Sequence, residues 1–456
     1  MAETNRCDVV VVGAGFSGLA AALWLEEAGA DVRVVEAQGQ VGGRIRSIRR
    51  GDGLEEAGGA TIGGGYRAVT DAAKRYGVEL IDATPMLKFF REQELVLNGE
   101  IIRQAEWPRH AANAFPDGDR HHMPWTYGRV LTARHNPLSS PDVGDAGARD
   151  HDIAMHDWLG GLGLSDRAIA LAHGINTSYG RDAHDVSALT MLSRAAFSVA
   201  QRSQTPAGVV GYTARDGVQR VPEAMAAALA REVRLDTAVV GIDDTGSRAR
   251  VACASGANFL ADNVVCSLPF PVLRTIAIDP PLVDAQATAV ATLPSQAMTQ
   301  VYLDCASSFW DADGYSPSLF TDGIAGMVAA ARRGENPGEV TSLTAWAMGR
   351  NAARLDALSD AEAGAAVIAQ IEAVRPAARG QLTFAGRQSW GASRFARGGW
   401  AYFRPGQVGR FAGAMAEPHG RILFCGEHLA RFNRGMEGAM ESGERAARTL
   451  LGRGAA

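Results

Sequence analysis

The sequence predicts an α/β fold built around a parallel sheet, and three observations near the N-terminus lead to this prediction. Residues 8–12 read Asp-Val-Val-Val-Val, and a continuous β-branched run is typical of a parallel strand that is buried on both faces. A glycine-rich turn follows, then a helical pattern from Leu19 to Glu27 that Gly29 ends. A second strand, Asp31–Val35, ends at an acidic residue, which completes a βαβ unit.

The composition limits the classes of protein to which the chain can belong. Its 456 residues suggest two or three structural units at about 150 residues each. The 45 Lys+Arg residues are balanced by 50 Asp+Glu residues, which argues against a nucleic-acid partner because such a protein needs a basic surface. No apolar run approaches the length of a membrane span, and glycines interrupt the first one at once. We therefore expect neither a signal peptide nor a membrane partner.

The cysteines and histidines do not indicate a disulfide framework or a metal site. The five cysteines are widely spaced, form no CxxC pair and lie mostly in apolar runs, so we expect buried free thiols and a cytoplasmic location. Several histidines fall in loop-like sequence that lacks acids at ligand spacing, and we expect no metal there. These residues are Cys7, Cys253, Cys266, Cys305 and Cys425, and His110, His121, His122 and His135.

The rest of the chain predicts two interleaved domains. Residues 105–156 look irregular, and helical patterns resume at 166–172 and 187–199. A helix at 221–232 and short strands at 233–235, 238–243, 248–254 and 263–267 come next, then a strand-and-helix stretch from 297 to 376, a strand at 421–425 and a helix at 435–451. We predict one discontinuous domain from residues 1–84, 205–290 and 385–456, and a second domain inserted into it from residues 85–204 and 291–384.

The glycine turn of the first βαβ unit has the spacing of a dinucleotide site. It reads Gly13-Ala14-Gly15-Phe16-Ser17-Gly18. The first glycine allows a tight turn, Gly15 lets the backbone approach a pyrophosphate, and Gly18 lets the helix pack close to the sheet. The helix N-terminus offers free N–H groups to the phosphates, and Glu36 can accept hydrogen bonds from a ribose. Because strand, helix and acid are all present, a chance glycine turn is the weaker interpretation.

Two further small-residue turns favour FAD over NAD. Val41-Gly42-Gly43-Arg44 follows Glu36-Ala37 and suits a second loop over an extended diphosphate, with Arg44 pairing with it or reaching toward the flavin. The alternative for this loop is a surface turn with a solvated arginine. The turn Gly58-Gly59-Ala60-Thr61-Ile62 offers small residues where the backbone could meet a flat ring.

Over nearly its whole length the sequence resembles the FAD-dependent amine oxidases of the monoamine oxidase type. Besides the motifs above, the resemblance rests on Trp390 followed by Gly398-Gly399-Trp400 and Pro405-Gly406, and on Phe424-Cys425-Gly426-Glu427-His428 followed by Gly435-Met436-Glu437-Gly438-Ala439. It implies a Rossmann-like FAD-binding domain with an inserted α+β substrate-binding domain. It also implies these cofactor-binding residues: Gly13, Ala14, Gly15, Phe16, Ser17, Gly18, Glu36, Ala37, Gly43, Arg44, Gly59, Ala60, Thr61, Ile62, Val239, Trp390, Gly426, Glu427 and Met436.

The last motif also has a physical logic of its own. A strand would deliver Gly426 and Glu427 to the cofactor, and a new helix would start near Met436. Its positive N-terminal end would face the pyrimidine end of the flavin, which becomes anionic on reduction. The alternative is a plain amphipathic C-terminal helix. By resemblance, Val239 would meet the adenine through its backbone.

On the substrate side the sequence departs from the family in three places. The family holds the amine between two aromatic rings; Trp400 matches one, and Gly435 stands where the other is expected, which leaves room for a bulkier substrate. Phe432 and Trp310 are alternative sources of a second ring. Gly399 aligns with the cysteine that bonds the flavin in some members, so we expect non-covalent FAD.

The third departure concerns the lysine that, in many members, contacts flavin N5 through a water. Counting back from Phe309-Trp310, the matching residue is Gln300, and the only lysines are Lys74 and Lys88. A glutamine can hydrogen-bond a water but brings no charge to stabilise superoxide. We therefore expect slow reaction with O2, or another electron acceptor.

The resemblance implies oxidation of an amine to an imine, with Trp400, Gln300 and Gly435 at the reacting end. An apolar site would favour the neutral amine, so no strong general base is required. One alternative is an L-amino acid oxidase, which would need an arginine for the carboxylate; Arg91 lies where the inserted domain begins. Another is a flavoprotein without amine chemistry, such as a desaturase. A homodimer is left open.

Overall fold

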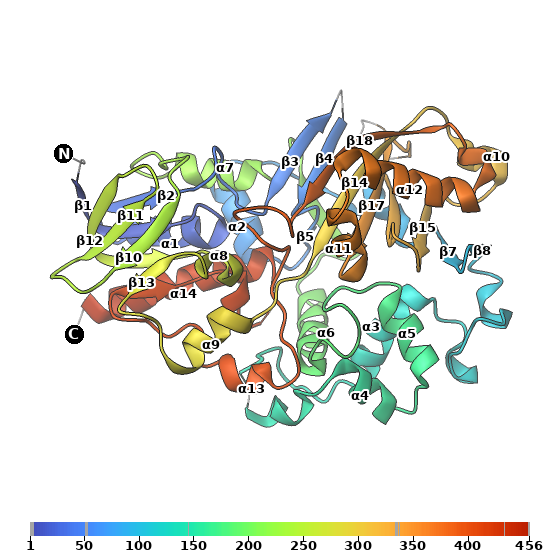
Figure 1. The fold of residues 1–456 in the computed structure, drawn as a ribbon, viewed down its shortest axis with the longest axis horizontal. Coiled ribbons are helices and arrows are strands. Elements are labelled where there is room, and N and C mark those ends of the chain that lie inside the picture. The colour runs from blue at the N-terminus through green and yellow to red at the C-terminus, as the bar shows by residue number, and fades with distance from the viewer. Residues whose placement is uncertain are drawn as a thin grey trace.

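Two large sheets organise the computed structural model, which describes residues 4–50, 53–144, 146–332, 336, 338–432 and 434–454. Figure 1 shows the first sheet on the left, beside both chain termini, and the second sheet at the upper right. A layer of helices lies below the second sheet in that view. The chain passes between the two halves several times, because segments from its beginning, middle and end all contribute to the first sheet.

The first sheet has the order β13-β10-β11-β12-β1-β2, and β19 pairs with the end of β12. Its parallel pairs join β1 to β2 and β12, β12 to β19, and β10 to β13. The valines of β1 alternate between two cores: Val9 and Val11 pack against α1 and α14, and Val10 and Val12 face the opposite side. The prediction of a strand buried on both faces is confirmed. The strands are β1 (Thr4–Val12), β2 (Val32–Val35), β10 (Val239–Asp243), β11 (Ala249–Cys253), β12 (Asn258–Cys266), β13 (Ala277–Asp279) and β19 (Ile422–Phe424).

Helix α1 begins at Phe16, three residues before the predicted start, and ends at Glu27 as predicted. Its N-terminus therefore follows the glycine turn directly. Gly13 has φ +100°, a conformation that L side chains rarely adopt, and a Cβ on Gly18 would lie 1.9 Å from the Gly13 carbonyl oxygen. Turn and helix can pack this closely only with glycine at both positions. The C-terminal helix α14 (Met436–Gly454) packs alongside α1.

The second sheet has the order β18-β14-β17-β16-β15-β7-β8 and is antiparallel except where β15 meets β7. Helices α11 and α12 pack on it. The elements are β7 (Gln93–Leu97), β8 (Glu100–Ile102), β14 (Met298–Cys305), β15 (Ser318–Thr321), β16 (Met327–Ala331), β17 (Ser342–Met348), β18 (Leu382–Ser389), α11 (Arg350–Asp356) and α12 (Asp360–Val374).

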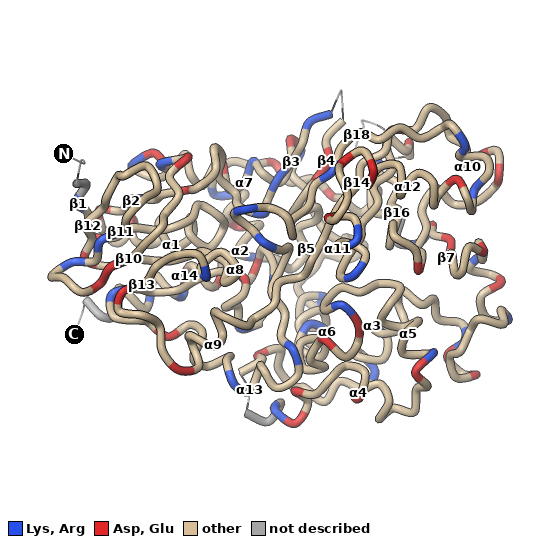
Figure 2. The backbone as a smooth tube through the Cα atoms, in the orientation of Figure 1, with Lys and Arg blue, Asp and Glu red and all other residues tan. Residues whose placement is uncertain are grey.

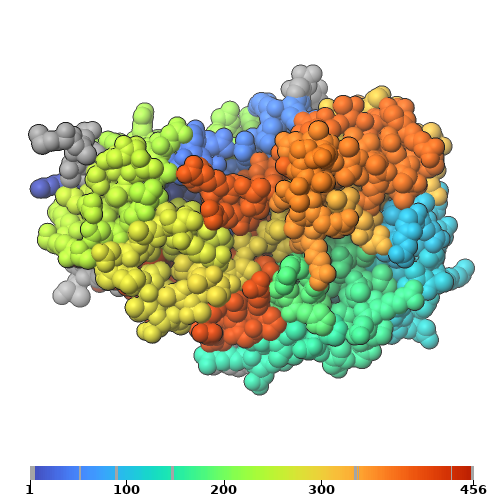
Figure 3. All heavy atoms as spheres, viewed as in Figure 1, coloured from blue at the N-terminus to red at the C-terminus, as the bar shows by residue number. Residues whose placement is uncertain are grey.

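The helical layer contributes α3 (Pro124–Arg134), α4 (Met155–Gly161), α5 (Asp166–Gly174) and α6 (Ala188–Arg202). Smaller elements connect the two halves. They are β3 (Arg46–Arg50), β4 (Gly53–Gly58), β5 (Ile62–Gly63), β6 (Leu80–Asp82), β9 (Gly211–Ala214), α2 (Arg67–Arg75), α7 (Arg220–Ala227), α8 (Phe270–Leu273), α9 (Asp284–Thr292), α10 (Phe309–Asp313) and α13 (Gln407–Phe411). In Figure 3, orange-red chain near α13 lies between the yellow atoms of the first half and the green atoms of the helical layer.

The predicted bounds of several elements were wrong. The helix predicted to Glu232 ends at Ala227, and the strand predicted at 233–235 is a single bridge between Arg234 and Val35. The segment 105–156, expected to be irregular, contains α3, where Pro124 starts a helix whose buried side carries Trp125, Tyr127 and Leu131. The domain boundary predicted at 384/385 falls inside β18, so residues 385–389 pair within the second sheet.

Lys and Arg residues are interspersed with Asp and Glu residues along the chain trace, as Figure 2 shows. This distribution fits the near-neutral balance of the composition. Among the described helices, none combines the length and the apolar character that crossing a membrane would require.

We predict that one buried histidine makes stability depend on pH. His173 of α5 is 5% exposed, and its Nε2 donates to the Tyr179 carbonyl at 3.2 Å. Burial lowers its pKa to about 4. Because the unfolded chain takes up the proton near pH 6.5, the free energy of unfolding should fall as the pH drops from 6.5 to 4, by up to about 3 kcal/mol.

Urea unfolding of His173→Gln over this pH range measures the effect, and a shallower pH slope than that of the wild type is expected. His135→Gln, which changes an exposed histidine, is the control. An unchanged slope in His173→Gln would show that other groups dominate.

Candidate cofactor and substrate cavity

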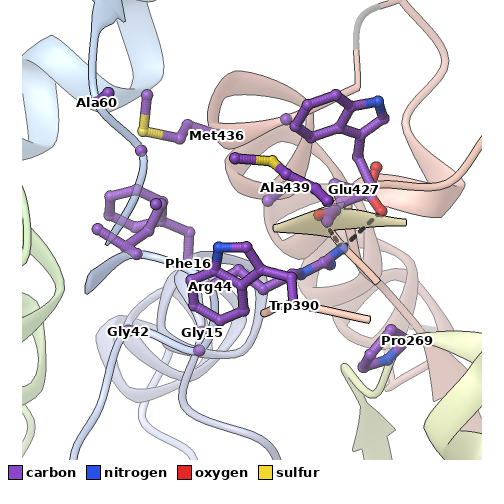
Figure 4. Close-up of a pocket in the computed structure, with 18 of the residues that line it drawn as sticks. Gly15, Phe16, Gly42, Arg44, Ala60, Pro269, Trp390, Glu427, Met436 and Ala439 are labelled. Atoms are coloured by element: carbon purple, nitrogen blue, oxygen red, sulfur yellow. Dashed lines mark hydrogen bonds and ion pairs between the residues drawn. The ribbon is translucent and has the colours of Figure 1, made fainter. Parts of the chain in front are cut away.

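A cavity of about 760 Å³ runs between the two halves of the molecule. Its lining comes from the glycine turn of β1, the loops around β4 and β5, the helical layer, the second sheet and the start of α14. Figure 4 shows Gly15, Gly42, Arg44, Trp390 and Glu427 gathered around the same space. Residues from both ends of the chain therefore meet at one site.

The glycine turn and Glu36 form one end of this cavity. Glu36 is 6% exposed; its carboxylate accepts from the backbone N–H of Ala14 at 2.8 Å and of Gln38 at 3.0 Å. Burial raises the pKa of this carboxyl, although the backbone donors oppose that shift. A Cβ built on Gly15 would meet no atom closer than the Gly42 carbonyl at 4.0 Å, so this glycine leaves open space beside the N-terminus of α1. The geometry fits a diphosphate on the helix end and a ribose on the acid.

The second glycine loop lies against the first. The Gly42 N–H donates to the Ala14 carbonyl at 2.9 Å, and a Cβ on Gly43 would lie 3.5 Å from the Gly15 Cα. Ala37, Gly59, Ala60, Thr61 and Val239 also line the cavity. Three of the predicted cofactor residues do not line the cavity. Ala14 donates its N–H to Glu36, Gly18 packs on Gly13, and Ile62 is fully buried in β5.

Arg44 joins the N-terminal loops to the C-terminal motif. Its Nη1 donates to the Glu427 carboxylate at 3.1 Å and to the Gly399 carbonyl at 2.7 Å. The same Glu427 oxygen accepts from the Ala401 N–H at 2.9 Å. The other oxygen, Oε2, is buried and has no hydrogen-bond partner. A buried carboxylate oxygen without a partner is costly, so it is suited to a hydroxyl donor on a bound cofactor.

Two tryptophans of the cavity are each held by a hydrogen bond to a backbone carbonyl. Trp390 donates its Nε1 hydrogen to the Ala57 carbonyl at 2.7 Å, and Trp400 donates to the Ser178 carbonyl at 3.0 Å. Both line the cavity. Trp400 meets Tyr179 edge to face, with ring centroids 6.2 Å apart and an interplanar angle of 71°.

Tyr179 is the aromatic neighbour of Trp400 that sequence reasoning missed. Phe432 is 41% exposed and Trp310 packs against Phe309, so neither of these two candidates lines the cavity. Gly435 does line it, has φ +110°, and would place a Cβ in open space. The sequence around Tyr179 contains no motif that marks it as a site residue. Tyr179 lies in a loop after α5, and the position of this loop depends on the helical layer.

Gln300 does not line the cavity. Its side chain is fully buried in β14, where its amide oxygen accepts from the Tyr302 hydroxyl at 2.7 Å and its Nε2 lies 3.5 Å from the Glu56 carbonyl oxygen. It lies opposite Trp346 in the sheet, and Trp346 is a lining residue. Contact with a cofactor through Gln300 thus remains a prediction.

Arg91 is an exposed residue outside the cavity, so the structure gives it no role in holding a carboxylate. The five cysteines are free thiols, four of them buried, and none lines the cavity. Within the described ranges, the histidines singled out above form no metal-ligand group, but His156, Asp157 and His184 bring ligand atoms within 4.8 Å of one another. His156 already lies 3.2 Å from Asp166, and two of the three residues are exposed.

Comparison with known proteins gives the family. The chain belongs to the flavin-containing amine oxidoreductases, whose family model matches residues 16–451. Human amine oxidase [flavin-containing] B is 25% identical over 98% of this chain and 86% of its own length. The L-amino-acid oxidase of Sistrurus catenatus edwardsii is also 25% identical, over 98% of this chain and 88% of its own.

Solved structures agree with this assignment. A triple mutant of putrescine oxidase, from a redesign of cofactor binding, superposes with a TM-score of 0.80 at 25% identity, covering 99% of this chain and 100% of that one. Cyclohexylamine oxidase from Brevibacterium oxydans has a TM-score of 0.78 at 23% identity, covering 98% and 99%. The predicted family and the predicted α/β FAD-binding fold are therefore confirmed, and the protein is a flavin-containing amine oxidase.

We predict that Arg44 and Glu427 stabilise the fold as a pair. Arg44→Met would leave the 6% exposed Glu427 carboxylate without its cation, so the free energy of unfolding should fall by about 3 kcal/mol. The double variant Arg44→Met, Glu427→Gln should recover part of this loss because no buried charge remains. Urea unfolding of the two single variants and the double variant measures the coupling.

The exposed pair Arg215–Glu79 supplies the matched control, since Arg215→Met should cost far less. Additive losses in the Arg44 and Glu427 variants would contradict the proposed pairing.

Proposed function

We propose that this enzyme holds FAD non-covalently and oxidises an amine to an imine. The observation that carries the proposal is the single cavity that joins the glycine turn and Glu36 to Trp400 and Tyr179. When bound, FAD would supply at N5 the acceptor for a hydride from the carbon that bears the nitrogen, and water would hydrolyse the resulting imine to an aldehyde or ketone and ammonia or an amine. Reoxidation would use O2 with release of H2O2, or another acceptor.

The chain's own residues fit the two ends of such a cofactor. Glu36 and the N-terminus of α1 would bind the ribose and the diphosphate, and the unpartnered Glu427 Oε2 would accept from a hydroxyl between the diphosphate and the ring. Met436 and Ala439 bring the N-terminal turn of α14 to the cavity, where its positive end would stabilise negative charge. Arg44 orients Glu427 and the Gly399 backbone, and so the position of Trp400.

The reacting end is apolar. An alkylammonium ion with a pKa near 10.4 must lose its proton before the carbon can release a hydride. Desolvation among aromatic and methionine side chains favours the neutral amine, so positioning replaces a general base. The apolar lining side chains that share a cluster with Trp400 are Tyr179, Phe320, Met327 and Trp346.

Non-covalent attachment is supported by the lining itself. The described residues that line the cavity include neither cysteine nor histidine, and Gly399 offers no nucleophile. We further propose a cytoplasmic protein without a nucleic-acid partner, on the grounds of free thiols and mixed surface charge. A homodimer stays open.

Oxidation of an α-amino acid is the second candidate, because Arg434 precedes Gly435 and lines the cavity. Its Nη1 donates to the His428 carbonyl at 3.0 Å and its guanidinium lies over Phe403, while Nη2 is buried without a partner. Burial lowers the pKa of this arginine. A carboxylate on the reacting carbon could accept from Nη2.

We predict that simple amines bleach the flavin absorbance of the FAD-loaded protein under anaerobic conditions. A panel of primary amines and α-amino acids should show which class reduces the flavin, and acid precipitation should release the yellow colour into the supernatant. Colour that stays with the pellet would contradict non-covalent attachment. A flavin that no amine or amino acid bleaches would refute the proposed reaction.

We also predict slow reoxidation by O2, because Gln300, which stands where many family members have a lysine, brings no positive charge. Stopped-flow mixing of the reduced enzyme with aerated buffer measures the rate. Gln300→Lys should raise it, and Gln300→Met, which has similar length and no charge, is the matched control. Fast reoxidation of the wild type would refute the expectation.

A further inference from the structure

Two arginines of the helical layer line the cavity with no hydrogen-bond or ion-pair partner for their guanidinium groups among the described residues. Arg129 lies on α3 and Arg194 on α6, and these helices pack against each other. Neither guanidinium makes a hydrogen bond or an ion pair with any residue that the structure describes. Their N–H donors therefore face the cavity space and not a protein acceptor.

The two charges also lie close enough to disfavour each other. Burial, and to a smaller extent the positive charge of Arg194, lowers the pKa of Arg129 to about 10. Arg129 therefore stays charged at neutral pH. Like charges in a cavity of reduced dielectric are destabilising unless an anion lies between them.

Among the described residues, no acid that lines the cavity supplies that anion. The cavity is lined by carboxylates that each have partners elsewhere: Glu36 accepts from Ala14, Glu55 from Ser342, Glu56 from Ser47, and Glu427 from Arg44. Compensation of Arg129 and Arg194 must therefore come from a molecule that enters the cavity.

The place of the pair relative to the reacting end decides which part of a substrate it can reach. The Arg194 guanidinium lies over the Tyr179 ring, 5.5 Å from its centroid, and Tyr179 in turn meets Trp400. One aromatic ring thus separates Arg194 from Trp400. Phe320 and Met327, which also line the cavity, belong to the same apolar cluster as Tyr179 and Trp400.

We infer that Arg129 and Arg194 bind a carboxylate at the end of the amine substrate remote from the carbon that is oxidised. That this carboxylate belongs to a substrate rests on the proposed amine oxidation. The carboxylate site itself does not depend on that reaction. Two guanidinium groups can hold a carboxylate through several charge-assisted hydrogen bonds. The substrate class is an amine with an apolar body and a carboxylate at its far end, in contrast to an α-amino acid, whose carboxylate lies on the reacting carbon.

Binding of an unreactive pair of ligands tests the site directly. The probes are 4-ethylbenzoate and 4-ethylbenzamide, which share one apolar body and lack an amine, titrated calorimetrically into the FAD-loaded enzyme. Arg129→Gln and Arg194→Gln should each weaken benzoate binding about 10- to 100-fold and leave benzamide binding within about twofold. Arg202→Gln, an exposed arginine of the same helix, should change neither affinity.

Equal affinity of the wild type for the two probes, or benzoate affinity that both variants retain, would overturn the inference. Thermal melting shows whether each variant folds. If one variant does not fold, benzoate binding to the other variant tests the inference. Because these ligands cannot be oxidised, arginine-dependent benzoate binding in a protein that oxidises no amine would refute the proposed function and support the carboxylate site.

Turnover of a matched set gives the second test. Wild-type kcat/KM for 4-(2-aminoethyl)benzoate should exceed that for its carboxamide at least about tenfold, and Arg129→Gln should abolish the difference mainly through KM. Phenylalanine, with the carboxylate on the reacting carbon, should be poorer than 4-(2-aminoethyl)benzoate. Amine turnover with no preference for the remote carboxylate would overturn the inference while leaving amine oxidation intact.

Discussion

The contact on which the site depends is the pairing of Arg44 with Glu427, residues from opposite ends of the chain. One guanidinium nitrogen binds both the carboxylate and the Gly399 carbonyl, and the same carboxylate oxygen binds the Ala401 N–H. Trp400 lies between Gly399 and Ala401 in the chain. The ion pair therefore fixes the relative position of the cofactor loops, the C-terminal motif and the aromatic wall, and it leaves one carboxylate oxygen free to face a cofactor.

The cavity divides into parts with different chemistry. Near the glycine turn it offers backbone N–H groups and carboxylates, which suit phosphates and hydroxyls. Near Trp400 and Tyr179 it is apolar, which suits a neutral amine. Beyond Tyr179 it presents two guanidinium groups without acids. A substrate that satisfies all of these surfaces would be apolar in its middle and anionic at one end.

The sequence predicted the nucleotide-binding half well because its signals are local. The valine run of β1, the glycines that follow it and the acid after β2 all belong to one continuous βαβ unit, and Glu36 indeed holds the turn through Ala14. Prediction was weaker where position depends on tertiary packing. Tyr179 and the arginines of α3 and α6 carry no motif, and only the folded helical layer brings them to the cavity. The spacing from Phe309-Trp310 pointed to Gln300, but the Gln300 side chain is hydrogen-bonded to Tyr302.

The packing of α14 against α1 has a consequence for how the enzyme is made. A Cβ on Gly443 would lie 2.1 Å from the Ser17 carbonyl oxygen, so the final helix fits closely onto the first one. During synthesis the glycine turn emerges from the ribosome long before its covering helix. A nascent chain therefore cannot enclose its coenzyme until that helix has been made, and until then the apolar surface of α1 stays open to chaperones or to aggregation.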